Sequence, residues 1–476
     1  MQIRHTLLAT LFSISVSAVS SDRPAYADNW PQFRGVNATG ISREEARLPA
    51  DIGPDRHLLW KIPISKGHSS PAAVGTRVYL TALRDNRLLT LAIDSESGEL
   101  VWEAEARYET LEKVHRIGSH ATPSVATDGN VVISLFGSSG LHAYDLDGKL
   151  IWKQKMGPFD NSFGAAASPI IVDDLVVIIQ DHDTESFLAA YDKQTGDEAW
   201  RVNRSEFRRN YSTPVIWEHD GVKQIVIAGT AQVNAYDSKT GEHLWVVMRG
   251  SRVISATPVV GDDGQLYVVN SGGGESPNQP SFANLLTTAD TNRNKLMEKE
   301  ELPKSIIRSF LEQFDRDKDG SLNELEYESI RNTMTYASPL AFAIKPGGNG
   351  DITKTHVVWS VNKSIPRNAS PLVVGGMLFM IKDGGILTVL DAKTGIQLSS
   401  RRLSGTGKFF SSPIYGDGKI YAVSEVGKLN VITAQAKWKQ LATVDLGEDA
   451  YATPAIANGR IYIRTVNHLY CFGFKE

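Results

Sequence analysis

The stretch TPVVGDDGQLYVV, residues 257–269, contains a Thr-Pro dipeptide, a short apolar run, a glycine turn and a second apolar run. Two runs of β-branched and aromatic residues around such a turn are typical of paired antiparallel strands. The same order of features occurs eight times in the chain, and each copy begins with Ser-Pro or Thr-Pro. These dipeptides are Ser70-Pro71, Thr122-Pro123, Ser168-Pro169, Thr213-Pro214, Thr257-Pro258, Ser370-Pro371, Ser412-Pro413 and Thr453-Pro454.

The spacing of the dipeptides locates an insertion. Successive prolines, starting from Pro71, lie 52, 46, 45, 44, 113, 42 and 41 residues apart. One interval is therefore about 70 residues longer than the others. A regular period of about 20 to 50 residues is the signature of repeat architectures. We therefore interpret the long interval as one repeat interrupted by a separate segment.

Most copies continue with an Asp turn and a Trp-containing strand. The matching positions are Asp94, Gly98 and Trp102; Asp145, Gly148 and Trp152; Asp192, Gly196 and Trp200; and Asp237, Gly241 and Trp245. The Asp side chain caps its own turn, and Gly takes the left-handed backbone position. The Trp is a large apolar anchor between neighbouring sheets. Four short strands in about 40 to 45 residues predict one propeller blade, so the chain is predicted to be an all-β, eight-bladed β-propeller with four-stranded antiparallel blades.

Both ends of the chain contribute to the predicted closure of the ring. The last copy begins at Thr453 and has room for only three strands before Glu476. The segment Leu58–Ile62 lies upstream of the first copy and contains Trp60. We predict that this segment is the fourth strand of the last blade, which would remove an open sheet edge. An open solenoid or two sandwiches would not need a repeat divided in this way.

The composition narrows the class of protein. The chain has 476 residues, a formal net charge of −4 and a pI of about 6.3, which gives no electrostatic reason to bind nucleic acid. Cys471 is the single cysteine, so an internal disulfide and a Cys-rich metal site are excluded. We expect a monomer with five parts. They are a signal segment (1–27), an N-terminal extension (28–57), the first part of the propeller (58–271), an insertion (272–336) and the rest of the propeller (337–476).

The first 27 residues resemble an export signal. A short basic stretch, Met1–His5, is followed by an apolar run, Leu7–Val19, and by Ala25-Tyr26-Ala27. This order is that of a cleaved secretory signal, and no later segment is long and apolar enough to span a membrane. We therefore expect a periplasmic or extracellular protein, with an uncleaved anchor as the alternative. Residues 28–57 then form an N-terminal extension before the propeller.

Three stretches resemble the pyrroloquinoline-quinone (PQQ)-like repeat family. They are Trp30–Gly35, Phe136–Leu141 and Thr453–Tyr462. The chain is similar over residues 30–476 to exported PQQ-like propellers of planctomycete-type bacteria. It is more distantly similar to the outer-membrane assembly propeller lipoproteins and to quinoprotein alcohol dehydrogenases. The resemblance implies the propeller fold, but a PQQ-like repeat does not by itself imply that the quinone is bound.

The resemblance to quinoprotein dehydrogenases implies a second possible function. In that family PQQ and a calcium ion lie in the central channel, a disulfide between adjacent cysteines often covers the cofactor, and an aspartate is the general base. The single cysteine excludes such a pair, and no ligand set can be matched residue by residue. We therefore favour a non-catalytic binding or scaffold protein of the cell envelope, and no catalytic residue is assigned. A PQQ-dependent alcohol dehydrogenase, with PQQ as cofactor, is the alternative.

The inserted segment, about residues 272–336, carries the most specific chemical motif. The stretch DRDKDGSLNELE, residues 315–326, fits the twelve-residue EF-hand loop that binds Ca²⁺ through oxygen ligands. Gly320 permits the sharp turn, and Leu322 is the apolar residue that pairs with a partner loop. The predicted ligands are Asp315, Asp317, Asp319, the Ser321 carbonyl, Asn323 and Glu326.

A second loop lies 25 residues earlier, beginning at Asp290. Its predicted ligands are Asp290, Asn292, Asn294, the Leu296 carbonyl, Glu298 and Glu301. Lys295 stands where glycine is expected, and two ligands are amides. Weak calcium binding and an empty structural partner therefore both stay open. Because calcium outside the cytoplasm is usually abundant, we expect a structural or docking module rather than a sensor.

The loops before the repeat prolines form a possible ligand face. Six of these loops carry a cation: Lys66, Arg116, Arg209, Arg252, Arg367 or Lys408. His68, His120 and Tyr211 lie nearby, as does Phe410. These loops share one face of a propeller, where positive charge can attract an anionic ligand or a peptide. The expected partner is a protein, a glycan or an envelope component, and ordinary solvated loop charge is the alternative. The tetrapeptide Gln180–Asp183 resembles a metal or acid/base cluster, but it lies where one strand turns into the next, so we expect a solvated turn.

Overall fold

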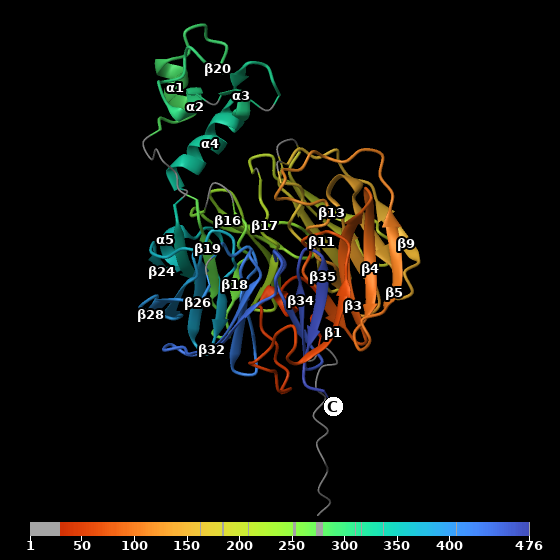
Figure 1. Ribbon diagram of the computed structural model, residues 1–476. Helices are drawn as coiled ribbons and strands as arrows, with labels where there is room; N and C mark the ends of the chain where they lie inside the picture. Colours follow the sequence, from red (N-terminus) through yellow and green to blue (C-terminus); the bar gives the residue numbers. More distant parts are fainter. Residues whose placement is uncertain are drawn as a thin grey trace, which may run out of the picture.

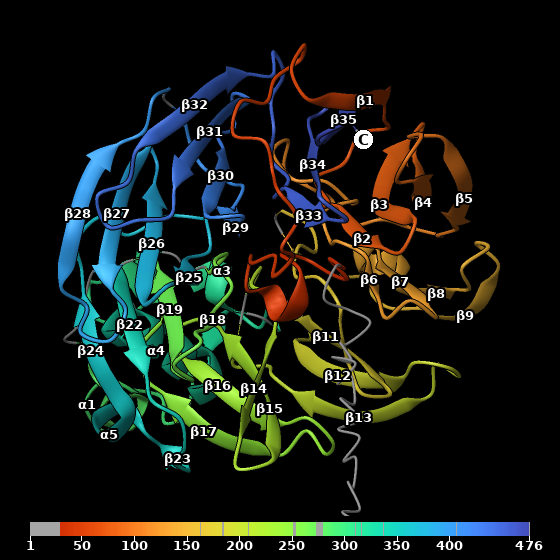
Figure 2. The ribbon, with the colours of Figure 1, turned by 90° about the horizontal axis from the view of Figure 1, so that it is seen from below.

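The computed structural model describes residues 29–475, apart from residues 162, 183–184, 208, 251–253, 273–278, 310, 316, 337 and 406. Eight sheets of at least four strands surround a central axis, and Figure 2 shows them as blades seen along that axis. The predicted eight-bladed all-β propeller with a small helical insertion is therefore confirmed. The predicted signal segment, residues 1–27, lies outside the described residues.

The first four blades each contain four strands that are consecutive in the chain. Blade one contains β2 (Ala72–Val74), β3 (Arg77–Arg84), β4 (Arg87–Asp94) and β5 (Leu100–Ala106). Blade two contains β6 (Ala126–Thr127), β7 (Val132–Leu135), β8 (Leu141–Tyr144) and β9 (Leu150–Gln154), with the short helix η2 (Gly137–Ser139) between β7 and β8. Blade three contains β10 (Ile170–Val172), β11 (Leu175–Gln180), β12 (Phe187–Asp192) and β13 (Glu198–Asn203). Blade four contains β14 (Val215–His219), β15 (Val222–Ala228), β16 (Val233–Asp237) and β17 (His243–Val247).

The other four blades differ in how the chain enters and leaves them. Blade five contains β18 (Val259–Val260), β19 (Leu266–Asn270), β22 (Leu340–Ile344) and β24 (Val357–Val361). Blade six contains β25 (Leu372–Val374), β26 (Met377–Lys382), β27 (Ile386–Asp391) and β28 (Gln397–Arg402). Blade seven contains β29 (Ile414–Gly416), β30 (Lys419–Val423), β31 (Lys428–Thr433) and β32 (Gln440–Asp445). Blade eight contains β33 (Ala455–Ala457), β34 (Arg460–Arg464), β35 (His468–Phe472) and β1 (Leu58–Pro63).

Burial explains why the strands of one blade have different sequence patterns. Nearly every residue of β4 is buried, because neighbouring blades cover both faces of this strand. The outermost strand β5 alternates between exposed and partly buried residues. The inner strands therefore read as continuous apolar runs, and the outer strands read as alternating ones.

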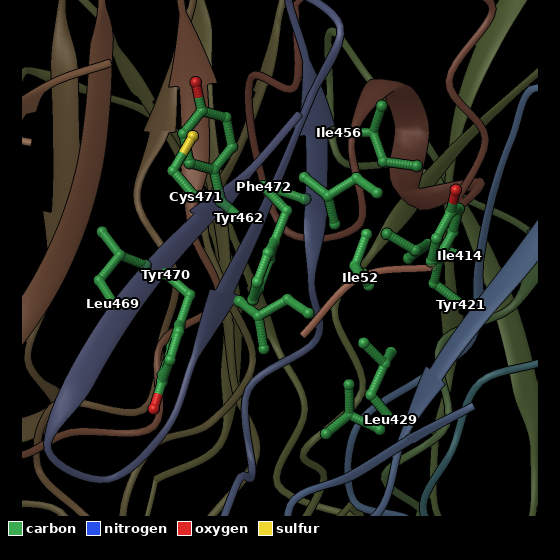
Figure 3. Packing of buried hydrophobic residues seen from close by; sticks show 14 of the residues in the cluster. Ile52, Ile414, Tyr421, Leu429, Ile456, Tyr462, Leu469, Tyr470, Cys471 and Phe472 are labelled. Atoms are coloured by element: carbon green, nitrogen blue, oxygen red, sulfur yellow. The ribbon is translucent and has the colours of Figure 1, made fainter. Parts of the chain in front are cut away.

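The last blade is closed by the strand from the N-terminal part of the chain, as predicted. β1 pairs antiparallel with β35, and Trp60 lies opposite Cys471. Figure 3 shows the core at this closure, where Phe472 of blade eight, Tyr421 of blade seven and Ile52 of the N-terminal extension belong to one buried cluster. Segments far apart in the sequence therefore share a core, and the ring has no open blade here.

The Trp residues join neighbouring blades, as predicted. The indole ring of Trp102 in blade one lies against Gly148 of blade two, where an added Cβ would be 2.6 Å from the ring. The indole Nε1 of Trp102 also donates a hydrogen bond to the Leu146 carbonyl, at 2.8 Å. The same packing of ring on turn glycine joins Trp60 to Gly98, Trp152 to Gly196, Trp200 to Gly241 and Trp359 to Gly395.

Blade four departs from the predicted four strands. A fifth strand, β23 (Gly350–Asp351), pairs parallel with β17 at its outer edge. This strand and helix α5 (Thr353–His356) come from residues 345–356, which replace the short turn between β22 and β24 of blade five. The indole Nε1 of Trp245 in β17 donates to Oε1 of Gln224 in its own blade, at 2.8 Å, whereas that of Trp102 donates to the next blade. The chain thereby covers the outer edge of blade four with its own backbone.

A closed ring of hydrogen bonds connects all eight blades at their inner edge. In each blade the backbone N–H of one Ser or Thr donates to the side-chain hydroxyl of the equivalent residue in the next blade, at 2.9 to 3.2 Å. The members are Ser70, Ser124, Ser168, Thr213, Thr257, Ser370, Ser412 and Thr453, and the N–H of Thr453 donates back to Ser70.

This ring corrects one repeat position. The sequence places Thr122-Pro123 at the start of the second copy, but Ser124 accepts the hydrogen bond from Ser70. The Thr122 hydroxyl donates to the Ser119 carbonyl, at 2.8 Å. The second copy is shifted because the loop before it is longer, so a matching dipeptide lies two residues before the position that completes the ring.

The N-terminal extension covers the centre of one face of the propeller. Figure 2, seen from below, shows the short helix η1 (Val36–Ala38) at the centre of the blades. Asn37 forms two hydrogen bonds of 2.7 Å with the backbone of Ile216 in blade four. The fully buried Arg34 donates to the carbonyl of Pro371 in blade six, at 2.8 Å, and burial lowers its pKa to about 9. The extension therefore contacts inner strands on different sides of the ring, which its sequence did not indicate.

The insertion is a small helical module between β19 and β22. It contains α1 (Phe282–Thr288), β20 (Met297–Glu298), α2 (Ile306–Ser309), α3 (Leu311–Phe314), β21 (Ser321–Leu322) and α4 (Glu324–Tyr336). Its own core includes Phe282, Leu285, Met297, Leu322 and Tyr327. Figure 1 shows the module above one face of the propeller, with the C-terminal end of the chain at the opposite face. Among the described residues, no helix has the length and apolar character needed to cross a membrane.

Candidate functional site

The second loop of the module brings three predicted ligands together. Side-chain oxygens of Asp315, Asp317 and Glu326 all lie within 4.8 Å of one another. Asp315 also accepts hydrogen bonds from the backbone N–H groups of Asp319 and Gly320, at 3.1 and 2.8 Å. The loop backbone thus wraps around the Asp315 carboxylate. Such a set of carboxylates suits a hard, oxygen-seeking cation such as Ca²⁺.

Two of the predicted ligands also begin helix α4. The Asn323 N–H donates to Glu326 Oε2, and the Glu326 N–H donates to Asn323 Oδ1, both at 3.0 Å. This reciprocal pair is a capping box, which satisfies the first free N–H groups of a helix. Glu326 is almost fully buried, with 2% of its surface exposed. The first turn of α4 and the candidate metal site are therefore built from the same side chains.

The first loop adopts a positive φ at the same position as the second loop, although it has lysine there and not glycine. Lys295 has a φ of 65° and Gly320, at the matching position of the second loop, has a φ of 90°. The side-chain amides of Asn292 and Asn294 both donate to Glu298 Oε1, at 3.2 and 2.6 Å. Because its φ is positive and it carries a side chain, Lys295 takes the left-handed conformation at some cost in strain.

Two carboxylate oxygens in the first loop have no hydrogen-bond partner. They are Asp290 Oδ1 and Glu298 Oε2, and both atoms are buried. A buried carboxylate oxygen without a partner is costly, so it marks a place where a cation would fit. This signal is absent from the sequence, because it depends on how the loop folds.

The two loops are joined as a pair. Met297 of β20 lies opposite Leu322 of β21, and Glu298 lies opposite Ser321. Met297 and Leu322 are the two apolar residues that the sequence assigned to this position, and both are fully buried. The short two-stranded sheet fixes one loop against the other.

The predicted ligand face is the face that carries the module. Strands alternate in direction within a blade, so every loop that leads into a new blade lies at the same face as the loop that contains the insertion. Lys66, Arg116, Arg367 and Lys408 are exposed there. Lys408 Nζ lies 3.8 Å from Glu425 Oε2. Arg209 is half-buried, and Arg252 lies outside the described residues.

Aromatic contacts, rather than cations, link neighbouring loops of this face. The His68 ring centroid lies 4.6 Å from that of Tyr451, and Phe410 lies 5.5 Å from Tyr451 on its other side. Burial and the nearby Arg464 guanidinium lower the pKa of His68 to about 4, so its ring is neutral at pH 7. These three residues come from the loops into blades one, seven and eight.

A second aromatic group lies in the loops into blades two, three and four. The His115 ring centroid lies 5.3 Å from that of Phe163, which lies 5.9 Å from that of Tyr211. The Tyr211 hydroxyl donates to Asn161 Oδ1 at 2.6 Å, and His120 Nε2 donates to the Glu112 carbonyl at 2.8 Å. Phe163 and Tyr451 were not among the predicted residues of this face, because the prediction rested on loop cations and the aromatic residues beside them.

Gln180, Asp181 and His182 are buried, which corrects the prediction of a solvated turn, and Asp183 lies outside the described residues. Asp181 and His182 are 1% and 2% exposed. Arg204 Nε and Nη2 donate to the two Asp181 carboxylate oxygens, at 2.8 and 2.9 Å, and the guanidinium stacks 4.0 Å from the Phe207 ring centroid. Arg204 comes from the next loop of this face, so spacing along the chain could not reveal the pair. The pair thus places the Arg204 guanidinium against Phe207.

Comparison with known proteins identifies the family. A profile described as outer membrane protein assembly factor BamB matches residues 53–184, 92–301 and 351–475. BamB of Yersinia pestis is 22% identical over 458 residues, which cover 91% of this chain and 100% of that protein. BamB of Burkholderia pseudomallei (strain K96243) is 26% identical over 218 residues, which cover 44% of this chain and 51% of that protein.

Solved structures agree on the fold. BamB from Moraxella catarrhalis has a TM-score of 0.56 at 13% identity, covering 88% of this chain and 99% of that chain. The computationally designed protein Ika8 has a TM-score of 0.54 at 10% identity, with the same coverage. A europium-containing methanol dehydrogenase has a TM-score of 0.44 at 12% identity, covering 94% of this chain and 98% of that chain. Since the family profile matches well over half of its residues, this chain belongs to the family of the outer membrane protein assembly factor BamB.

Proposed function

We propose that this protein is an exported, calcium-binding β-propeller that acts as a non-catalytic scaffold of the cell envelope. The family membership supports the scaffold, because relatives across nearly the whole chain are named as assembly factors for outer membrane proteins. We further propose a periplasmic location and a protein partner. The partner would bind the face that carries the module, where the exposed ring of Phe163 and the cations Lys66, Arg116 and Arg367 are available.

The calcium part of the proposal rests on the paired loops. In the second loop Asp315, Asp317, Asp319, Asn323, Glu326 and the Ser321 carbonyl would hold the ion. Asp315, Asp317 and Glu326 already converge in the structure. In the first loop Asp290 and Glu298 each present a buried oxygen that lacks a partner. We therefore propose that both loops bind Ca²⁺, the first more weakly because two of its ligands are neutral amides.

Calorimetry with calcium tests this part directly. The wild-type protein is expected to bind two calcium ions per chain, at a stronger and a weaker site. The double variant Asp315→Ala and Glu326→Ala should lose the stronger site, because it removes carboxylates from both ends of the loop. Its propeller melting temperature should change by about 2 °C or less, since the ring does not depend on the module.

A matched control separates ligation from overall charge. Glu324 lies in the first turn of α4 and is exposed, but it is not a predicted ligand. Glu324→Ala should therefore keep both sites. Loss of the stronger site in this variant would contradict the assigned ligands, and a large drop in melting temperature in the double variant would mean that the module is integral to the ring.

The scaffold part is tested against the quinone-dependent alternative. The purified protein is mixed with PQQ and Ca²⁺, and alcohol oxidation is followed with an electron-accepting dye. We expect no turnover and no tightly bound quinone absorbance. Tight quinone binding with turnover would overturn the scaffold and establish a dehydrogenase.

The envelope role is tested in cells that lack the gene. The amount of folded outer membrane protein should fall, and the wild-type gene should restore it. The double variant Phe163→Ala and Tyr451→Ala, which removes one ring from each aromatic group, should restore it only in part. Full restoration by this variant would mean that the partner does not bind this face.

A further inference from the structure

Helix α4 has two faces with different partners. Tyr327 and Ile330 are buried in the core of the module. Leu325, Glu328, Ser329 and Asn332 instead line a cleft of about 130 Å³ between the module and the propeller. Residues spaced by three and four lie on one side of an α-helix, so these four form a single face that is turned toward the propeller.

The propeller side of this cleft comes from two loops. Glu206 and Phe207 lie in the loop between blades three and four, and residues 230–232 lie between β15 and β16 of blade four. The Ser329 hydroxyl donates to the Glu206 carbonyl at 2.7 Å. Phe207 is held in place beneath the Arg204 guanidinium, which is paired with Asp181. The helix therefore docks beside the buried Arg204–Asp181 pair.

The docked residues are close in sequence to the candidate calcium ligands. Leu325 directly precedes Glu326, and Ser329 lies one turn after it. The C-terminal end of the helix has a separate attachment, because the Ser338 N–H donates to the Gly250 carbonyl at 3.1 Å. The N-terminal half of α4 thus contacts the propeller through the cleft and is fixed in the module by its capping box and its core residues.

Without a cation, the converging carboxylates of Asp315, Asp317 and Glu326 repel one another. This repulsion acts on the first turn of a helix of 13 residues, a length at which helices are only marginally stable on their own. We propose that calcium in the second loop holds the N-terminal half of α4 in the conformation that docks on blades three and four, so that the contact between the module and the propeller depends on calcium. This inference rests on the calcium binding proposed above.

Hydrogen exchange followed by mass spectrometry tests the inference on the full-length protein. With Ca²⁺ bound, the backbone amides of residues 206–207 and 230–232 should exchange about three- to tenfold more slowly than in EGTA. Residues 85–86, in the equivalent loop of blade one, do not line the cleft and should exchange at the same rate in both conditions. In the double variant Asp315→Asn and Glu326→Gln, calcium should no longer slow exchange at the cleft.

A second variant separates the docking from calcium binding. Leu325→Ala combined with Ser329→Ala removes the exposed apolar side chain and the hydroxyl that reach the propeller. It should still bind calcium by calorimetry, yet calcium should no longer protect residues 206–207 and 230–232. Thr287→Ala changes an exposed hydroxyl on α1, away from the cleft, and should behave as wild type.

The outcomes distinguish this inference from the function on which it rests. Calcium binding by calorimetry without any change in exchange at the cleft would overturn the inference and leave the calcium sites in place. Protection that persists in the Leu325→Ala and Ser329→Ala variant would also overturn it. Absence of calcium binding to the wild-type protein would overturn both.

Discussion

His142 shows how the ring changes the chemistry of a single side chain. It lies on β8 between the rings of Phe136 and Tyr144 and is 3% exposed. Burial lowers the pKa of His142 to about 4, compared with about 6.5 for histidine in an unfolded chain. Between these two pH values the unfolded chain binds more protons than the folded protein. The stabilisation from neutral His142 is therefore complete above about pH 6.5 and is lost as the pH falls toward 4.

This shift predicts a measurable pH dependence. The free energy of unfolding of the wild-type protein should fall by on the order of 3 kcal/mol from this residue alone between pH 6.5 and 4. His142→Gln removes the titrating group, so its unfolding free energy should fall less over the same range. Denaturant unfolding at several pH values measures both slopes. Equal slopes would mean that His142 is protonated at its usual pH in the folded protein.

Other residue roles could not be read from the sequence. The Asp turns and the Trp anchors were predictable, because each depends on local spacing and on a common packing rule. The Asp181–Arg204 pair was not, since it joins loops of the same face that only the ring brings together. The buried oxygens of Asp290 and Glu298 were also hidden, because burial of one atom depends on the folded loop.

The inner hydrogen-bond ring is the element that sets the blades side by side. Each Ser or Thr hydroxyl accepts from a buried backbone N–H of the neighbouring blade, so a residue without a hydroxyl at this position leaves a donor unsatisfied. The sequence predicted the repeat that carries this ring, and it placed seven of the eight members correctly. It missed Ser124 because the dipeptide Thr122-Pro123 imitates the pattern in the adjoining loop.

The second copy gives a matched test of this element. Ser124→Ala should lower the free energy of unfolding by about 1 to 3 kcal/mol, because the buried Ser70 N–H loses its acceptor. Thr122→Ala removes only a partly buried hydroxyl bonded within its own loop and should cost about 1 kcal/mol or less. Denaturant unfolding of the two variants compares them. A larger loss of unfolding free energy for Thr122→Ala would mean that Thr122, the position that the sequence indicated, belongs to the inner ring.

At the scale of the whole molecule, the fold was largely predictable and the use of its two faces was not. Repeat count, strand pattern and the missing last strand together predicted an eight-bladed ring closed by β1. The N-terminal extension carries no repeat, so nothing local showed that it covers the centre of one face. With that face covered and the module on the other, the two faces of the propeller are unlike.

Deletion of residues 58–62 tests the closure of the ring. This change removes most of β1, which leaves the edge of β35 unpaired and uncovers part of the core around Phe472. We expect a clear loss of thermal stability and a tendency to aggregate, measured by calorimetry and light scattering. Deleting five residues of the module, 284–288 in α1, disturbs only the module's own core and should leave the propeller melting unchanged. An unchanged melting temperature after the first deletion would refute the closure by β1.

The pairing of β1 with β35 also fixes the order of events during synthesis. Lys61 lies opposite Tyr470, so the partners are separated by roughly four hundred residues of chain. The strand made first must wait for these roughly four hundred residues before it can pair, and blade eight cannot form before β35 has been made. Folding to the closed ring is therefore a late step, and until then an unpaired strand edge is exposed to other chains. A protein of this design benefits from a chaperone, or from delayed folding, until β35 is available to pair.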